Sequence, residues 1–168
     1  LEYLFRTVYI LKGGEEEVFI PRFSYMGFRY VLVLGITEAQ ATEDLLSYEI
    51  MHSGFDTIGS FTCSDELVNR LQAAAVNSDL SNFFYFPTAC PHREKNGWTG
   101  DASLSAEQML LNFQVENSLQ EWLCQIRKAM NDAGTIPGII PTAGWGFAWG
   151  NGPSWDCVLF YLPYYIWL

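Results

Sequence analysis

The apolar residues of this chain change their spacing near residue 60, and this change limits the folds that are open to it. Residues 18–20 and 28–34 are β-branched and aromatic runs bordered by turn residues such as Gly13, Gly14 and Gly35, a pattern typical of strands. From Ser64 onward the apolar residues recur every three or four positions, which is typical of helices that face a core. We therefore predict a strand-rich part, residues 1–58, and a mainly helical part, residues 59–168.

Neither part is predicted to be a closed fold. Three or four strands with one apolar face cannot close a sandwich, so residues 1–58 are interpreted as the C-terminal strands of a β-sandwich. Ser64 is a good N-cap residue for the first helix of the second part. Three helices are predicted, over residues 64–79, from residue 101 or 103 to about 113, and over residues 115–130 with Gly134 as a stop. Residues 134–154 are rich in Gly, Pro and Trp, and a loop of this length is uncommon unless it is functional.

Charge and cysteine spacing narrow the possible partners. The formal net charge of −10 disfavours nucleic acid and an anionic membrane surface, because both attract basic patches. The four Cys stand far apart in the sequence with no C-x-x-C pair, so we expect free, mostly buried thiols and neither a metal nor another cofactor.

The two ends of the sequence suggest a longer parent protein. No window of about twenty residues is apolar enough to span a membrane, and the first residues are neither a signal peptide nor an initiator Met. Residues 158–168 form an apolar run without a polar tail. We therefore expect the remainder of a parent polypeptide to be one partner of this chain.

Residues 90–101 (CPHREKNGWTGD) are the strongest candidate for a functional site. One carboxyl group, Glu94, lies between two basic residues, and Trp98 and a second carboxyl group, Asp101, follow. Cleavage of a glycosidic bond requires a carboxyl group that protonates the leaving oxygen, and an indole ring and further carboxylates can bind the sugar. The alternative is a surface turn with solvated charges, and these residues alone do not exclude it.

This run resembles the signature of the bacterial α-L-rhamnosidases, a family of inverting glycoside hydrolases. In that signature Cys-Pro, a short charged stretch, Gly-Trp-Thr-Gly-Asp and a helix follow one another. Residues 23–31, 59–71 and 152–156 are similar to further segments of the family. The resemblance implies the end of a β-sandwich domain followed by the first helices of a six-hairpin α/α toroid, which this chain leaves incomplete. It also implies hydrolysis of terminal α-L-rhamnosyl linkages in a rhamnose-containing glycan or glycoside.

The resemblance assigns roles to six residues. Glu94 matches the family's general acid, and a proton donor requires that Arg93 and Lys95 point away from it. Asp101 is either a ligand of sugar hydroxyls or the N-cap of the helix that follows. The remaining candidates for substrate binding are Trp98, Arg93, Trp155 and Asp156.

Two departures from the family leave alternatives open. Ala89 stands where the family usually has Asp, and the segment from residue 90 to residue 97 is one residue shorter than the commonest form. No segment matches the family's general base, so we expect the isolated chain to be inactive. The alternatives are a non-catalytic carbohydrate-binding fragment and a purely structural interface between a β-sandwich and a helical domain.

Overall fold

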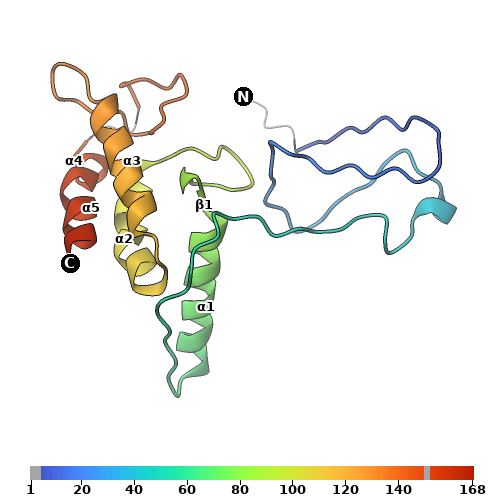
Figure 1. The fold of residues 1–168 in the computed structure, drawn as a ribbon, viewed down its shortest axis with the longest axis horizontal. Coiled ribbons are helices and arrows are strands. Elements are labelled where there is room, and N and C mark those ends of the chain that lie inside the picture. The colour runs from blue at the N-terminus through green and yellow to red at the C-terminus, as the bar shows by residue number, and fades with distance from the viewer. Residues whose placement is uncertain (1–4, 150–151) are drawn as a thin grey trace.

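The computed structural model describes residues 5–149 and 152–168, which divide into a helical part and an extended N-terminal arm, residues 5–50 (Figure 1). The elements, in chain order, are the 3-10 helix η1 (Glu38–Gln40), α1 (Glu66–Ser81), β1 (Phe83–Phe84), β2 (Phe86–Pro87), α2 (Thr99–Asn112), α3 (Glu116–Ala129), α4 (Pro153–Asp156) and α5 (Val158–Trp167). The three longer helices predicted from residue 64 to residue 130 are confirmed. Between α1 and α2, β1 and β2 form a short antiparallel pair.

The core of the helical part lies where α2, α3 and α5 pack side by side (Figure 1). Its fully buried side chains are apolar and include Ala106 of α2, Leu119 and Ile126 of α3, and Leu162 of α5. Trp122 of α3 is also buried, and its indole N–H donates to the carbonyl of Ile140 at 3.0 Å. This bond attaches the loop after α3 to the core, because a buried indole N–H requires an acceptor.

Two helix starts differ from the prediction. The N-cap of α1 is Asp65 and not Ser64, and its Oδ1 accepts from the backbone N–H of Leu67 at 2.8 Å. The N-cap of α2 is Trp98, so the helix begins at Thr99. Asp101 therefore lies within the first turn, and its predicted role as an N-cap is wrong. A carboxylate in a first helical turn is still favourable, since it faces the positive end of the helix dipole.

The strands predicted for the N-terminal arm are not formed in residues 5–58 that the structure describes. The glycine turn is present as a bend, where Glu17 Oε1 accepts from the backbone N–H of Lys12 at 2.9 Å and of Gly13 at 3.2 Å. An apolar run becomes a strand only when a neighbouring strand pairs with it, and these runs have no ladder partner here. Their apolar side chains remain exposed, with Ile10 at 83% and Leu32 at 81%.

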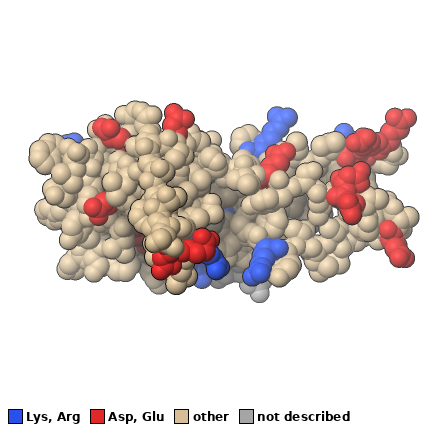
Figure 2. Space-filling model, turned by 90° about the horizontal axis from the view of Figure 1, so that it is seen from below, with Lys and Arg blue, Asp and Glu red and all other residues tan. Residues whose placement is uncertain are grey.

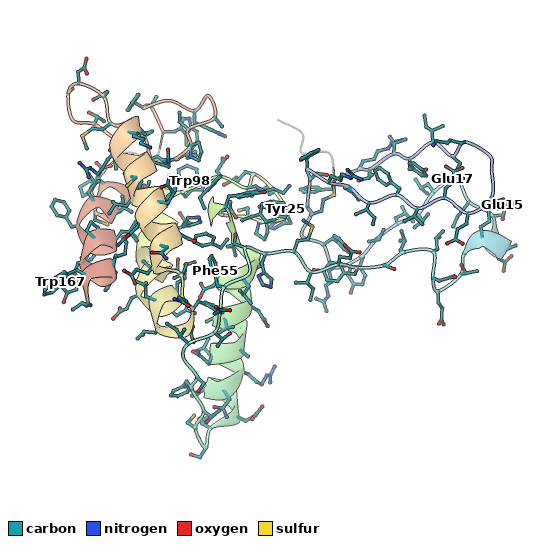
Figure 3. All side chains as sticks on the ribbon, viewed as in Figure 1. Glu15, Glu17, Tyr25, Phe55, Trp98 and Trp167 are labelled. Atoms are coloured by element: carbon teal, nitrogen blue, oxygen red, sulfur yellow. The ribbon has the colours of Figure 1, made fainter. Side chains whose placement is uncertain are left out.

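The arm joins the helical part through aromatic and backbone contacts. Tyr25 packs on Phe84 with ring centroids 4.5 Å apart, and the N–H of Gly27 donates to the carbonyl of Pro91 at 3.2 Å (Figure 3). Phe55 contacts Phe83 edge to face at 4.7 Å. Residues 25–27 of the arm therefore lie beside β1 and the loop that follows β2.

Charges are unevenly distributed over the surface. On the face shown in Figure 2, acidic groups gather at the end of the arm, and the helical part exposes few charges. Within the described ranges, no helix is long and apolar enough to cross a membrane.

All four Cys are free, as predicted, but the expectation that most are buried is wrong, because Cys63 and Cys124 are exposed and Cys90 and Cys157 are partly buried.

Candidate active site

The segment between β2 and α2 is a tight loop held by its own backbone. The N–H of Ala89 donates to the carbonyl of Asn96 at 2.8 Å, and the N–H of Arg93 donates to the carbonyl of Cys90 at 2.9 Å. Cys90 and Lys95 have φ values of 58° and 53°, a left-handed conformation that costs free energy for residues with a Cβ atom. The loop therefore presents Glu94 in a defined position.

Two side chains hold the carboxylate of Glu94. The indole N–H of Trp98 donates to Oε1 at 2.7 Å, and Nε of Arg93 lies 3.4 Å from Oε2. Arg93 therefore does not meet the condition on which the assignment of Glu94 as the proton donor depends. The side chain of Arg93 is 52% exposed, and that of Glu94 is 16% exposed. Lys95 does point away, because its Nζ lies over the ring of Tyr25, 5.2 Å from the centroid.

Trp98 and Trp155 meet at the start of α2, although 57 residues separate them in the sequence. Their ring centroids are 6.4 Å apart in an edge-to-face arrangement, which is a favourable geometry for aromatic pairs. A Cβ atom on Gly100 would lie 3.0 Å from the indole of Trp155. The glycine of the Trp-Thr-Gly-Asp sequence is therefore needed so that the second Trp can pack against the helix.

Asp101 lies on the exposed surface of the first turn of α2. Partial burial of its carboxyl raises its pKa above the ordinary value, and the negative charge of Glu94 raises it further. Glu94 is thus close enough to Asp101 to affect the ionisation of Asp101.

Asp156, at the end of α4, is the one candidate residue for which the described residues show no contact with the others. Its Oδ1 is buried without a hydrogen-bond partner among the described residues, and the same is true of Nε1 of Trp155. No contact found in the described ranges joins Asp156 to Glu94. The structure therefore brings Arg93, Glu94, Trp98, Asp101 and Trp155 together and leaves Asp156 behind Trp155.

A cavity of about 260 Å³ opens beside Trp98 and Asp101. Its other side is formed by Asp79 near the end of α1, by Thr88 and by Ala89. The sequence analysis did not select Asp79 or Thr88. Asp79 follows the half-buried Val76 by three positions, so helical spacing placed a carboxylate on an inward face, and this signal could have identified it.

Two other possible sites are weaker. A hollow of about 340 Å³ in the arm is lined by Val33, Ile36, Leu45 and others, which carry no reactive group. No group of three or more His, Cys, Asp or Glu side chains suited to a metal ion occurs in the part of the chain that the structure covers.

Comparison with known proteins identifies the family. Residues 56–168 match the model of the bacterial alpha-L-rhamnosidase 6 hairpin glycosidase domain, and residues 3–52 match the bacterial alpha-L-rhamnosidase concanavalin-like domain. An alpha-L-rhamnosidase of Formosa agariphila is 34% identical over 151 residues, which are 83% of this chain and 16% of that protein. One from Streptomyces avermitilis is 32% identical over 149 residues, 83% of this chain and 14% of that protein.

Solved structures agree with these matches. The alpha-L-rhamnosidase described as from Dictyoglumus thermophilum superimposes with a TM-score of 0.64 at 33% identity, over 68% of this chain and 13% of that one. The Streptomyces avermitilis alpha-L-rhamnosidase complexed with L-rhamnose gives a TM-score of 0.63 at 26% identity, over 68% of this chain and 11% of that one.

The helical part therefore matches the six-hairpin glycosidase class of domain. The chain belongs to the bacterial α-L-rhamnosidase family, and it spans about a sixth of the length of its Formosa agariphila relative.

Proposed function

We propose that this chain forms the general-acid half of the active site of a longer glycosidase that hydrolyses terminal α-L-rhamnosyl linkages with inversion. The observation that carries the proposal is the position of Glu94, whose carboxylate accepts from Trp98 and lies near Asp101. Trp98 and Asp101 both line the cavity. The names of the relatives support rhamnosides as the substrate, as does the L-rhamnose complex of the Streptomyces avermitilis protein.

In this proposal the residues of the loop have separate roles. Glu94 donates a proton to the leaving oxygen, Trp98 supplies an apolar ring face for the sugar, and Asp101 accepts hydrogen bonds from sugar hydroxyls. Arg93 first has to leave Glu94, since an adjacent cation favours the ionised carboxylate. Its side chain is half exposed, so an incoming substrate can displace it at little cost, and Arg93 then contacts the substrate. In the family the segment of Trp155 and Asp156 borders the pocket, so we assign both to substrate binding. Neither is among the residues that line the cavity beside Trp98.

The remainder of the site is expected from the rest of the polypeptide. An inverting glycosidase needs a second carboxylate about 6.5–9.5 Å from the first, which activates a water on the opposite face of the sugar. This chain has no segment like the family's general base, so the isolated chain should be inactive. We also propose that residues 1–58 end a β-sandwich domain and that residues 59–168 open an α/α toroid.

The alternative function is carbohydrate binding without cleavage. Two observations favour it: Arg93 and Trp98 both occupy the carboxylate of Glu94, and Ala89 lines the cavity where the family usually has Asp. In that case the complete protein binds a rhamnoside and releases nothing.

The test is the hydrolysis of p-nitrophenyl α-L-rhamnoside and of a rhamnosylated flavonoid by the complete protein, followed by NMR from the first minutes. The proposal predicts that β-L-rhamnose appears first, because inversion converts the α linkage into the β anomer. Initial release of the α anomer would contradict the inverting mechanism. Binding of both compounds without release of rhamnose would instead establish the alternative.

A further inference from the structure

The cavity beside Trp98 has a second polar wall, formed by Asp79 of α1 and Thr88 after β2. Asp79 is 6% exposed and Thr88 is 5% exposed, so neither is a solvated surface group. Asp79 comes from α1, and Thr88 stands at the start of the loop that ends at Trp98.

No hydrogen bond within the described residues explains why a polar side chain is buried at Thr88. Its Oγ1 is buried and lacks a hydrogen-bond partner among the residues that the structure describes. A buried hydroxyl without a partner is destabilising, and native proteins leave few of them. Since Thr88 lines the cavity, a ligand in the cavity is the partner that would satisfy it.

Asp79 is held in place by one hydrogen bond, and its carboxylate can accept more. Nε2 of Gln108 on α2 donates to Oδ2 at 2.6 Å, and a carboxylate can accept several further hydrogen bonds. Burial raises the pKa of Asp79 to about 6 against the opposing effect of the Gln108 bond. Gln108 is therefore a positioning residue, and Asp79, which lines the cavity, has the capacity to accept further hydrogen bonds.

The cavity selects a neutral ligand rich in hydroxyl groups. Its lining contains the carboxyl groups of Asp79 and Asp101 and no Lys, Arg or His, which disfavours anions. The described residues offer no three-ligand cluster for a metal ion. A volume of about 260 Å³ is just below the usual range for small-molecule sites, so one sugar ring is a suitable occupant.

We infer that Asp79 and Thr88 bind hydroxyl groups of the same terminal sugar that Trp98 and Asp101 contact, and that they help to determine which sugar is accepted. This inference rests on the proposed function. Asp79 accepts from one hydroxyl, and Thr88 exchanges a hydrogen bond with another. Neither residue takes part in proton transfer to the leaving group.

The experiment measures binding of L-rhamnose and its monodeoxy analogues to the complete protein by titration calorimetry. Thr88→Val keeps the shape and removes the hydroxyl, and should weaken L-rhamnose binding about 3–10-fold. Asp79→Asn can still accept from Gln108 but loses the charge, and should weaken binding about 10–100-fold. Each variant should also bind L-rhamnose and one deoxy analogue with more similar affinities than the wild type does, because the hydroxyl that it recognises no longer matters.

Matched variants separate recognition from folding. Thr88→Ser retains the hydroxyl and should bind as the wild type does. Thr135→Val and Asp132→Asn make the same chemical changes at exposed positions of the turn after α3 and should have no effect.

The outcomes are distinct. If the wild type binds and hydrolyses rhamnosides while Thr88→Val and Asp79→Asn bind all analogues as the wild type does, this inference is wrong and the proposed function stands. Weaker binding without any change in preference among the deoxy analogues would show a structural role and overturn it as well. If the wild type binds no L-rhamnose, both the inference and the proposed function are wrong.

Discussion

Glu94 has a fixed position, which the proposed proton donor requires. The loop backbone and the Trp98 N–H fix it, while the Arg93 contact is mostly open to water. A hydrogen bond from a ring that also lines the cavity couples the orientation of the carboxyl group to the surface on which the sugar would lie. Positioning of this kind is where enzymes obtain much of their rate advantage.

The contribution of Asp79 to the stability of the folded protein should decrease as the pH rises. Its pKa in the fold, about 6, lies above the ordinary value of 3.8, so the folded protein holds this proton more tightly than the unfolded chain does. The resulting stabilisation is fully present below about pH 4 and is lost as the pH rises through about 6. The side chain of the Asp79→Asn variant cannot ionise. The free energy of unfolding of this variant, relative to that of the wild type, should therefore increase by up to about 3 kcal/mol between pH 4 and pH 8.

Urea unfolding of the wild type and the variant at these two pH values measures this difference. Asp132→Asn, at an exposed position, should show no comparable change. An equal effect of Asp79→Asn at both pH values would show that folding does not raise the pKa of Asp79. A variant that gains stability and loses affinity would fit the usual conflict between stability and function at binding sites.

The sequence identified the loop side of this site but not the α1 side. Glu94, Trp98 and Asp101 could be predicted because they lie within one short segment with a recognisable order. Asp79 and Thr88 were not selected. Helical spacing could have indicated that Asp79 faces inward, but no sequence pattern shows that these two residues line one cavity with Trp98 and Asp101. The direction of the Arg93 side chain also depends on the loop conformation, which residue type alone does not determine.

Gly97 is the residue on which the junction between the loop and α2 depends most. Its carbonyl accepts from the N–H of Ile140 at 2.8 Å, and a Cβ atom at this position would lie 2.1 Å from the carbonyl oxygen of Ile140. Backbone atoms cannot move apart without breaking this pairing, so Gly97→Ala should lower the free energy of unfolding by about 1–3 kcal/mol.

Chemical denaturation measures this loss, and Gly14→Ala is the matched control. No atom lies within 4 Å of a Cβ atom built on Gly14, so that substitution should change stability by less than about 0.5 kcal/mol. Equal effects of the two substitutions would show that the approach of Gly97 to Ile140 is not tight in solution.

Helices were predicted more reliably than strands for a physical reason. The hydrogen bonds of a helix are internal, so a stripe such as Leu119, Trp122 and Ile126 on α3 needs only one neighbouring surface. A strand depends on the segments beside it. The apolar runs of the arm therefore predict strands that are not formed in the described residues, although residues 3–52 match a concanavalin-like domain.

The molecule exposes large apolar side chains in two separate regions. In the arm, Phe23 is 101% exposed and Leu34 is 79% exposed, and on α5 Phe160 is 77% exposed and Trp167, at the outer edge of Figure 3, is 79% exposed. Apolar surface of this extent is unusual for a monomer and promotes association. The 168-residue chain produced alone should therefore self-associate.

Light scattering coupled to gel filtration tests this prediction over a range of concentrations. The mass should exceed 19.1 kDa and rise with concentration. A monodisperse monomer that unfolds cooperatively would show that the exposed side chains do not drive association. Phe160→Ser and Trp167→Ser would identify the contribution of α5, because both side chains face solvent and not the core.

The most direct measurement of the central claim, that Glu94 is the proton donor, compares two leaving groups in Glu94→Gln of the complete protein. The substitution keeps the size of the side chain and removes the acidic proton. For an alkyl or sugar aglycone, which needs protonation, kcat/KM should fall by about 10²–10⁴-fold. An activated aryl α-L-rhamnoside should be far less affected. Equal losses on both substrates, or no loss on either, would contradict the assignment, and the acid would then be sought at Asp101 and Asp156.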